Sequence, residues 1–560
     1  MLKYIGGLPM KQKNSACNII GAILLTVVLI IQAVCLVLVA SKKQGMHIDE
    51  NYSYILSNSY DASKIAYDEG VWNTWLSGDS FRKYLVVEEG EQFSYGKVYY
   101  NNTQDAHPPL YYFLLHTVCS FFPEEYTPWF GLGLNIVLIL IAQILLFSLA
   151  KEFTGSSLWG VVPVALYGGM MAFVDTTLFI RMYALLSLLT VLLLFAHYRL
   201  IKNPYKKRAL LGCFAVTFLG IFTQYYFTFI AFFIAVASCI WLFYRHDFKQ
   251  LLIYAGGMLF SVLLVFIVYP AGITQITGSE TNNVGNEVWG NLFNFSGWKT
   301  ALVSMYNQAY PLIVSGILDY KWAVIGIAVT AFLLSCLLRR KGRDFKQSES
   351  NWKKTVPFVV ILFAVLIATV ALVSHISGKF IYIRYVYNLF PVLALAVSIC
   401  IWLIAEVMKL HKNILAIGII AVWLLGSVGI VQNSRCSYLY TTRAARDQEI
   451  MEYSEDRPLV LLNNGSTYHP TSLLHFLLES DQVFLGNYNK VSNIEEIFSQ
   501  VDCNNGVVVI VLTDQYWSSG LDGENVLTEL VSECSKLDYY EQIGVCDFST
   551  AYLAYPEANN

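Results

Sequence analysis

Residues 18–40, NIIGAILLTVVLIIQAVCLVLVA, carry no charged side chain and are soon followed by His47-Ile48-Asp49-Glu50. An apolar run of this length is long enough to span a bilayer as a helix. The acidic pair Asp49-Glu50 therefore comes just after a predicted membrane span, where a carboxylate has lost some water and feels a nearby cation strongly. We expect the rest of the chain to bring cations and a lipid-binding groove to these two acids.

The composition is that of a polytopic membrane protein. Of the 560 residues, 56% are hydrophobic and only 14% are charged, and the mean hydropathy is +0.50. Soluble proteins of this size carry about a quarter charged residues. The net charge of −3 favours no nucleic-acid partner. The first apolar run is too long for the core of a signal peptide, so we expect a retained signal-anchor.

The hydropathy pattern predicts about eleven transmembrane helices. Lysines precede the first span and basic clusters occupy alternate turns, so the positive-inside rule places the N-terminus in the cytoplasm and the C-terminus outside. The protein is therefore expected to be a multi-pass protein of the cell membrane. The predicted spans are 18–40, 130–150, 157–174, 177–199, 209–222, 224–244, 250–269, 322–338, 355–374, 381–405 and 413–431.

Two stretches between spans are expected to lie at the outer surface. The first, 41–128, is acidic and aromatic and too long for a plain connector, so we expect surface helices in it, for example over 110–122. The second includes the apolar segment 301–318. We interpret this segment as a surface or re-entrant helix, because an extra crossing would place the basic residues of 339–354 outside.

After about Arg435 the composition becomes that of a soluble domain. Short apolar runs at 459–462 and 507–512 predict buried strands, and 492–501 and 524–534 have helical spacing. This alternation predicts a small α/β domain with a partly parallel sheet. The predicted organisation is a transmembrane domain over 1–434, with the large first extracytoplasmic loop 41–128, and an extracytoplasmic α/β domain over 435–560.

Cysteines leave two alternatives open. Cys436, Cys503, Cys534 and Cys546 lie together in the C-terminal region and could form disulfides if that region is exported. Unpaired, buried cysteine is the other interpretation, and it is the commoner state.

The predicted topology gathers polar residues at the extracytoplasmic rim of the membrane. A leaving lipid phosphate needs arginine or lysine, and an incoming hydroxyl needs a base, for which a carboxylate at a dry interface is suited. The pattern therefore favours group transfer from a lipid phosphate. The residues from separate segments are Asp49, Glu50, His47, His107, Arg181, Tyr183, Gln224, Tyr225, Tyr226, His375, Lys379, Arg384 and Tyr385.

Each of these features taken singly also has an ordinary interpretation. Adjacent acids at the end of a span are commonly solvated, and arginines there commonly anchor a helix at the interface. Tyr183, Tyr225 and Tyr385 fit the aromatic belt of a membrane protein. His47 and His107 are candidate ligands for a divalent cation, although the spacing fixes no ligand geometry and no cofactor is certain.

Four short motifs in this order resemble those of the C-type (GT-C fold) glycosyltransferases. They are Asp49-Glu50 after the first span, the segment His107-Pro108-Pro109-Leu110-Tyr111-Tyr112, the segment Arg181-Met182-Tyr183-Ala184-Leu185, and Arg384-Tyr385 followed by Pro391. The resemblance is to the bacterial relatives of protein O-mannosyltransferases and to the lipid A aminoarabinose transferases, and it covers roughly residues 15–435. One departure is Gln224 before Tyr225, where many relatives have histidine.

The resemblance implies an inverting transfer of a sugar from a polyprenyl-phosphate donor to an acceptor on the extracytoplasmic face. Asp49 would be the general base, and Glu50 would orient it, for example by pairing with Arg181. Arg384, with Lys379 or Arg181, would hold the lipid phosphate. His107, Tyr183, Tyr225 and Tyr385 would border the substrate pocket. The partners implied are the lipid-linked donor, membrane lipid, and an acceptor glycan, lipid or protein.

Two other functions are compatible with the sequence. A transporter or flippase of lipid-linked sugars would more often have internal repeats, broken spans and charges at mid-membrane. A non-catalytic member that only binds lipid-linked glycan would not need the acid at Asp49.

Overall fold

The computed structural model describes residues 15–278, 283–294, 296–338, 345–377, 381–433, 436–490, 494–515 and 520–556. The chain divides into two compact units. We call the first the membrane unit, comprising Met1–Ser41, Ala106–Tyr111 and Gly131–Ser437. The second, the sheet unit, comprises Lys42–Asp105, Tyr112–Phe130 and Tyr438–Asn560. The division falls inside α4 (Leu110–Cys119) and near the start of α5 (Pro128–Thr154).

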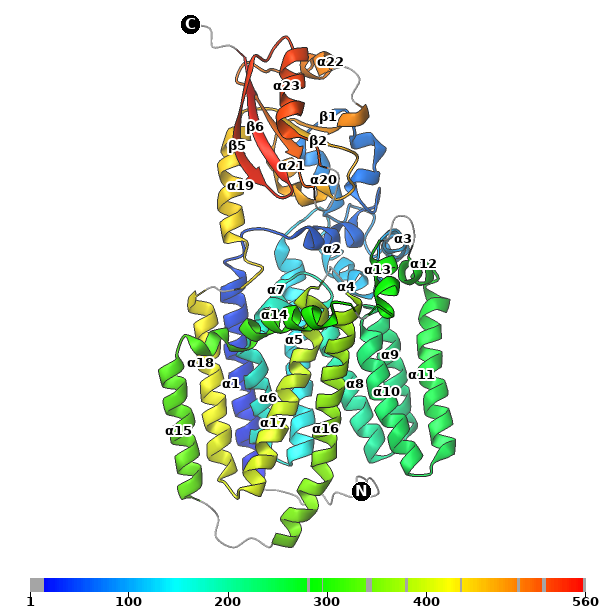
Figure 1. The fold of residues 1–560 in the computed structure, drawn as a ribbon, viewed down its shortest axis with the longest axis vertical. Helices are drawn as coiled ribbons and strands as arrows, with labels where there is room; N and C mark the ends of the chain where they lie inside the picture. The colour runs from blue at the N-terminus through cyan, green and yellow to red at the C-terminus, as the bar shows by residue number, and fades with distance from the viewer. Residues whose placement is uncertain are drawn as a thin grey trace. The chain divides into compact units, whose positions relative to one another are not determined.

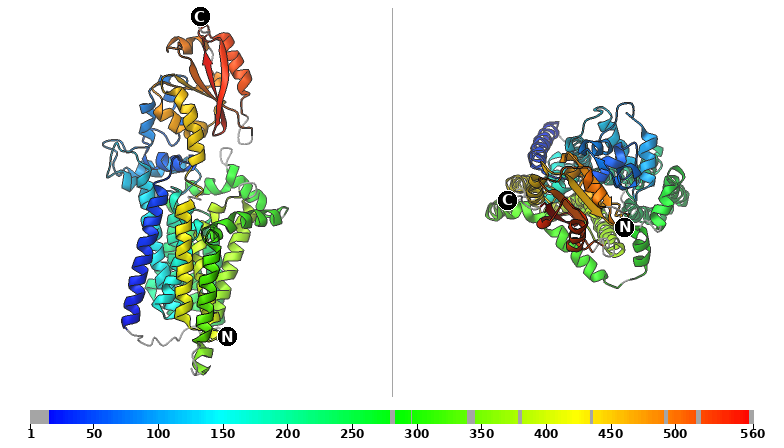
Figure 2. Two further views of the ribbon diagram at one scale, coloured as in Figure 1. Left: turned by 90° about the vertical axis from the view of Figure 1, so that its left-hand side faces the viewer. Right: turned by 90° about the horizontal axis from the view of Figure 1, so that it is seen from above.

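The membrane unit is helical, and Figures 1 and 2 show most of its helices running roughly parallel as a bundle. Besides α5 its elements are α1 (Ser15–Ala40), α6 (Ser157–Gly168), α7 (Met171–Leu178), α8 (Tyr183–Lys202), α9 (Lys207–Ile221), α10 (Phe227–Tyr244), α11 (Phe248–Val268), α12 (Ala271–Thr277), α13 (Asn283–Leu292), α14 (Trp298–Leu318), α15 (Lys321–Leu337), α16 (Phe345–Ile376), the 3-10 turn η5 (Ile383–Leu389), α17 (Phe390–Val407) and α18 (Lys412–Asn433).

The predicted class, a polytopic helical membrane protein with a C-terminal α/β domain, is confirmed. Within the described residues, eight helices are long and apolar enough to cross a membrane, or up to ten if each of two bent pairs is one span. All eleven predicted segments contain helix. The one predicted span that is not among the ten found by length and composition is α9. With 15 residues α9 rises about 22 Å, less than the roughly 30 Å of a hydrocarbon core.

Two pairs of consecutive helices are bent sharply. α6 and α7 are bent by 67° at Gly169-Met170, within a predicted single span. α14 and α15 are bent by 80°, so α14 does not continue the direction of α15. This agrees with the interpretation of 301–318 as a surface or re-entrant helix.

Glycines let three elements of the membrane unit approach backbone to backbone. A Cβ at Gly316 on α14 would lie 2.6 Å from the carbonyl oxygen of Gly426 on α18, and one at Gly426 would lie 2.9 Å from that of Gly169. Such distances leave no room for a methyl group. Close approach at small residues is how helices associate where lipid removes the hydrophobic driving force.

Gly316→Ala should therefore destabilise the membrane unit. Overpacking of this kind costs about 1–3 kcal/mol, so the thermal unfolding temperature of the purified protein in detergent should fall. Gly326→Ala on α15 is the matched control, because a Cβ there meets nothing within 4 Å. A Gly316→Ala protein that unfolds no earlier than the control would show that the close approach is not required.

The sheet unit contains a six-stranded sheet in the order β1-β3-β2-β4-β6-β5. β2 is parallel to both β3 and β4, and the remaining pairs are antiparallel. Its elements are α2 (Ile48–Asn58), η2 (Ile65–Tyr67), η3 (Glu69–Val71), β1 (Trp75–Leu76), η4 (Gly78–Tyr84), α3 (Tyr95–Thr103), α19 (Thr441–Ser454), β2 (Leu459–Asn463), α20 (His469–Ser472), α21 (Leu474–Glu479), β3 (Val483–Asn487), η6 (Tyr488–Lys490), α22 (Ile494–Ser499), β4 (Val507–Leu512), α23 (Gly523–Glu533), β5 (Tyr539–Cys546) and β6 (Ser549–Tyr555).

The partly parallel sheet agrees with the predicted strands at 459–462 and 507–512. β2 and β4 are buried along their whole length, as expected for central parallel strands. α23 packs its apolar face, including Val526, Leu527 and Leu530, into the same core as β4. The cysteines Cys436, Cys503, Cys534 and Cys546 are all buried, and the last three are in the thiol form.

The first loop belongs to the same compact unit as the C-terminal domain, which differs from the predicted division at 434/435. β1, from the first loop, pairs with β3 through Trp75 opposite Phe484 and Leu76 opposite Val483. The indole of Trp75 also donates a hydrogen bond to the carbonyl oxygen of Ile497, at 2.9 Å. A strand of two residues leaves no alternating pattern in the sequence, so this pairing could not be predicted.

Candidate functional site

Within the membrane unit, the candidate site is built around the break between α7 and α8. Asn135, fully buried on α5, donates hydrogen bonds to the carbonyl oxygens of Thr177 (3.1 Å) and Phe179 (2.9 Å). Its own side-chain oxygen accepts a hydrogen bond from the Tyr111 hydroxyl, at 3.2 Å. Asn135 therefore ties Tyr111 of the segment 107–112 to the end of α7, just before Arg181. Sequence analysis missed it, although a lone asparagine in an apolar span was a usable signal.

Arg181 lies in this break and is 4% exposed. Its Nη2 atom lies 3.4 Å from both ring nitrogens of His107, so the guanidinium and the imidazole are in contact. The backbone N–H of Arg181 donates to the carbonyl oxygen of Phe179, at 2.7 Å. A guanidinium so far removed from water is costly unless a ligand or partner compensates its charge. The structure thus brings two of the predicted site residues, Arg181 and His107, into contact.

Arg384 is the second arginine of this region and precedes α17 in the 3-10 turn η5. Its guanidinium carbon lies 4.4 Å from the ring centre of Tyr382, 5.6 Å from that of Phe179 and 5.9 Å from that of Tyr385. Cation–π contacts of this kind hold a guanidinium without neutralising it. These rings position the Arg384 guanidinium beside Phe179.

Aromatic rings connect the two arginines. Tyr183 stacks on Phe179 with 5.8 Å between ring centres and meets Tyr387 edge-on, also at 5.8 Å. Phe179 therefore contacts both Tyr183 and Arg384 and lies two residues before Arg181. Sequence analysis did not single out Phe179, because an apolar ring in an apolar span gives no signal.

Tyrosines and a lysine are among the remaining predicted residues of this unit. Tyr385 lies 4.9 Å from the Tyr226 ring. The Tyr225 hydroxyl donates to the side-chain oxygen of Gln275 on α12, at 2.6 Å, and its backbone N–H donates to Gln224, at 2.8 Å. Tyr225 is thus joined to α12. Lys379 lies outside the described residues.

Within the sheet unit, Asp49 and Glu50 begin α2 but have different environments. Glu50 is fully buried, and its carboxylate accepts a hydrogen bond from the backbone N–H of His47, at 2.7 Å. The His47 ring accepts one in turn from the backbone N–H of Asp49, at 3.1 Å. This reciprocal cap fixes the first turn of the helix. The Asp49 side chain is 24% exposed, with a carboxylate oxygen 3.5 Å from the His47 ring.

Lys43 is the cation that accompanies Glu50. Its ammonium lies 3.0 Å from the Glu50 carboxylate, and the two side chains are 3% and 0% exposed. It also donates to the carbonyl oxygen of Tyr438, at 2.8 Å, and lies 4.7 Å from the ring centre of Tyr440. Burial, together with the negative charge of Glu50, raises the pKa of Tyr440 well above its usual value. Sequence analysis did not single out this lysine, which follows the first span, and the pairing of Glu50 with Arg181 stays a prediction.

Lys43→Met should strongly destabilise the start of α2, because it leaves the Glu50 carboxylate buried and unpaired. Removing one partner of a buried pair costs about 3–5 kcal/mol, whereas removing both charges costs far less. Limited proteolysis of the purified protein should therefore cleave Lys43→Met faster than Lys43→Met/Glu50→Gln. Lys42→Met, at the exposed neighbouring position, serves as the control. Equal cleavage of all three variants would contradict a structural role for the pair.

His47 and His107, the two candidate metal ligands, have other contacts in the structure. The described part of the chain contains no group of three or more His, Cys, Asp and Glu side chains that could hold a metal ion. His47 instead caps α2, and His107 contacts Arg181.

Over nearly the whole chain the structure is similar to ArnT from Cupriavidus metallidurans. The match to the form bound to undecaprenyl phosphate has a TM-score of 0.38 and 12% identity, and covers 96% of this chain and 98% of that chain. The apo form matches with a TM-score of 0.37 and the same identity and coverage. The S. cerevisiae protein O-mannosyltransferase Pmt1-Pmt2 complex bound to the sugar donor matches with a TM-score of 0.31 and 13% identity, over 53% of this chain and 38% of that chain.

These solved structures are GT-C glycosyltransferases, the class that the sequence motifs resemble. No protein-family model matches the sequence. No curated protein matches it either. The function is therefore inferred from the residues of this chain.

Proposed function

We propose that the protein is a membrane glycosyltransferase. It transfers a sugar from a polyprenyl-phosphate donor to an acceptor on the extracytoplasmic face, with inversion at the anomeric carbon. The observation that carries the proposal is the arrangement around Phe179, where two arginines are held near a bundle of spans by aromatic and histidine rings. Such cations suit the phosphate of a lipid that is itself embedded in the membrane.

In the proposed reaction Asp49 accepts the proton of an acceptor hydroxyl. The hydroxyl oxygen attacks the anomeric carbon of the donor sugar, and the bond from that carbon to the phosphate oxygen breaks. The bonding electrons leave with the polyprenyl phosphate, whose increased negative charge Arg384 and Arg181 stabilise, with Lys379 as a further candidate. Asp49 suits the role because its side chain is partly accessible, whereas Glu50 is committed to Lys43 and to the helix cap.

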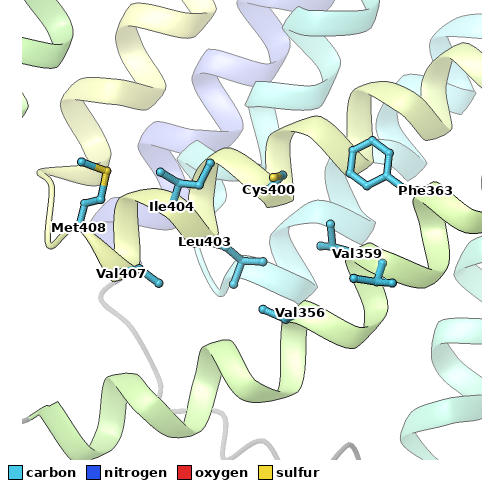
Figure 3. Close-up of a pocket in the computed structure, with 9 residues that line it drawn as sticks. Val356, Val359, Phe363, Cys400, Leu403, Ile404, Val407 and Met408 are labelled. Atoms are coloured by element: carbon cyan, nitrogen blue, oxygen red, sulfur yellow. The ribbon is translucent and has the colours of Figure 1, made fainter.

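An apolar cavity in the membrane unit is a candidate binding place for the isoprenoid chain of the donor. It has a volume of about 530 Å³ and lies between α16 and α17 (Figure 3). Val360, Ile404 and Val407, which help to line it, are half exposed or more on the surface of the bundle. The cavity begins near Cys400 on α17, the helix that directly follows the 3-10 turn carrying Arg384. A long isoprenoid chain whose phosphate is bound at Arg384 can follow this span to the cavity.

A second candidate function is movement of a lipid-linked sugar across the membrane without bond cleavage. The 67° break between α6 and α7 favours it, since discontinuous helices are typical of transporters. The two functions differ in whether the donor is consumed. Release of polyprenyl phosphate supports transfer, and intact donor that changes leaflet supports transport.

Asp49→Asn should lower sugar transfer by about 100- to 10 000-fold, the usual contribution of a general base. The measurement is the kcat for transfer of labelled sugar from a polyprenyl-phosphate donor. Asp79→Asn, at an exposed acid of the same unit, should retain activity. An Asp49→Asn protein that is folded in membranes and transfers at the normal rate would remove Asp49 from the mechanism.

Arg384→Ala should raise the KM for the donor by about tenfold or more, because a hydrogen bond to a charged group contributes about 1.5–3 kcal/mol. The KM for the acceptor should change less. Arg245→Ala is the matched control, since Arg245 also lies over an aromatic ring, 4.9 Å from the centre of Trp241. A donor KM equal to that of the control would argue against phosphate binding by Arg384.

A further inference from the structure

The sheet of the sheet unit has a topological switch point between β2 and β4. From β2 the chain passes through α20 and α21 to β3 on one side, and then through α22 to β4 on the other side. Figure 1 labels β2 in this sheet. Ligands of open α/β sheets bind beyond the carboxyl ends of the strands at such a point. The strands that flank this point, β2 and β4, end at Asn463 and Leu512, and β3, on the other side of β2, ends at Asn487.

Neutral polar groups gather at this edge. Asn463 and Asn487 are register partners in β2 and β3. The Asn463 side-chain oxygen accepts a hydrogen bond from the backbone N–H of Gly465, at 2.7 Å. Gly465 has a φ of +90°, and a Cβ there would lie 3.1 Å from the Asn487 side-chain nitrogen. The loop after β2 therefore passes close against Asn487, with Ser466 as its next residue.

Two polar atoms of this edge are buried without a protein partner. The Ser466 hydroxyl oxygen and the Asn487 side-chain oxygen are shielded from solvent, and within the described residues neither makes a hydrogen bond. Buried polar groups nearly always have a partner, so such atoms mark a place where one is supplied by another molecule. Both atoms are able to accept a hydrogen bond, and the hydroxyl can also donate one.

The same loop lies beside the helix that carries Asp49. The Tyr52 hydroxyl donates to the carbonyl oxygen of Thr467, at 3.3 Å, and the Asn51 side chain donates to that of Thr471, at 2.9 Å. Tyr52 follows Asp49 by three positions, so both side chains lie on one face of α2, about 5–6 Å apart at Cβ. Burial raises the pKa of Tyr52 above its usual value, and the charges of Asp105 and Asp49 add to the effect.

We propose that the carboxyl edge formed by Asn463, Ser466 and Asn487 binds hydroxyl groups of an acceptor glycan and presents the next sugar to Asp49. The second half of this inference rests on the proposed glycosyltransferase function. Amides and hydroxyls, which both donate and accept, match the hydroxyls of a carbohydrate. The neighbouring His469 is buried and neutral, with a pKa lowered by burial to about 3, so it adds no charge that would select an anion.

The test uses the full-length protein in detergent and two variants, Ser466→Ala and Asn487→Ala. Exposed positions of the same unit supply the matched controls Ser532→Ala and Asn504→Ala. The probe is the mixture of water-soluble oligosaccharides released from the envelope of the source cells and labelled at the reducing end. Both site variants should bind the probe at least tenfold more weakly than the wild type, and the controls should bind it normally.

Transfer kinetics separate this inference from the proposed function. The site variants should raise the KM for the oligosaccharide acceptor while leaving the KM for the donor and the kcat at saturating acceptor unchanged. Wild-type protein that binds the probe but transfers no sugar would remove the proposed function and leave the glycan site. Wild-type protein that transfers sugar without binding the probe would overturn the glycan site. Site variants that bind the probe normally and unfold at a higher temperature than the wild type would also overturn the glycan site. That result would show that the unpaired Ser466 and Asn487 side chains only lower the stability of the fold.

Discussion

The buried ion pair between Lys43 and Glu50 is the interaction on which the position of Asp49 depends. A carboxylate with no exposed surface is stable only next to a cation and hydrogen-bond donors, and Lys43 and the backbone of His47 supply both. The pair fixes the first turn of α2, and the neighbouring Asp49 is thereby left at the surface of that turn. Two adjacent acids of the sequence thus have separate roles, one structural and one available for chemistry.

The two arginines of the membrane unit, Arg181 and Arg384, are also positioned by contacts with neighbouring side chains. Arg181 contacts the His107 ring, and Arg384 lies over the rings of Tyr382, Phe179 and Tyr385. In the proposed reaction these two arginines stabilise the phosphate of the lipid donor. Tyr183 stacks on Phe179, so the aromatic side chains of this region pack against the elements that carry both arginines.

Much of the fold was predictable because its causes are local in the sequence. The apolar runs predicted every span, and α9 is the predicted span that is too short to be counted among the ten. The strands at 459–462 and 507–512 were recognisable as buried apolar runs. The pairing of Trp75-Leu76 with β3, the bend after Gly168 and the contact between Lys43 and Glu50 were not predictable. Each depends on tertiary packing that leaves no periodic pattern. Within the site, Asp49, Glu50, His47, His107, Arg181 and Arg384 were singled out from the sequence, whereas Lys43, Asn135 and Phe179 were recognised only in the structure.

The central claim is that the bond between sugar and lipid phosphate is broken on this protein. The most direct measurement incubates the purified protein in liposomes with polyprenyl-phosphate sugars labelled in the sugar, together with envelope fractions as acceptor. The account predicts that label moves into the acceptor fraction and that an equal amount of polyprenyl phosphate is released. Label that stays on intact donor lipid, whether or not the lipid changes leaflet, would contradict it.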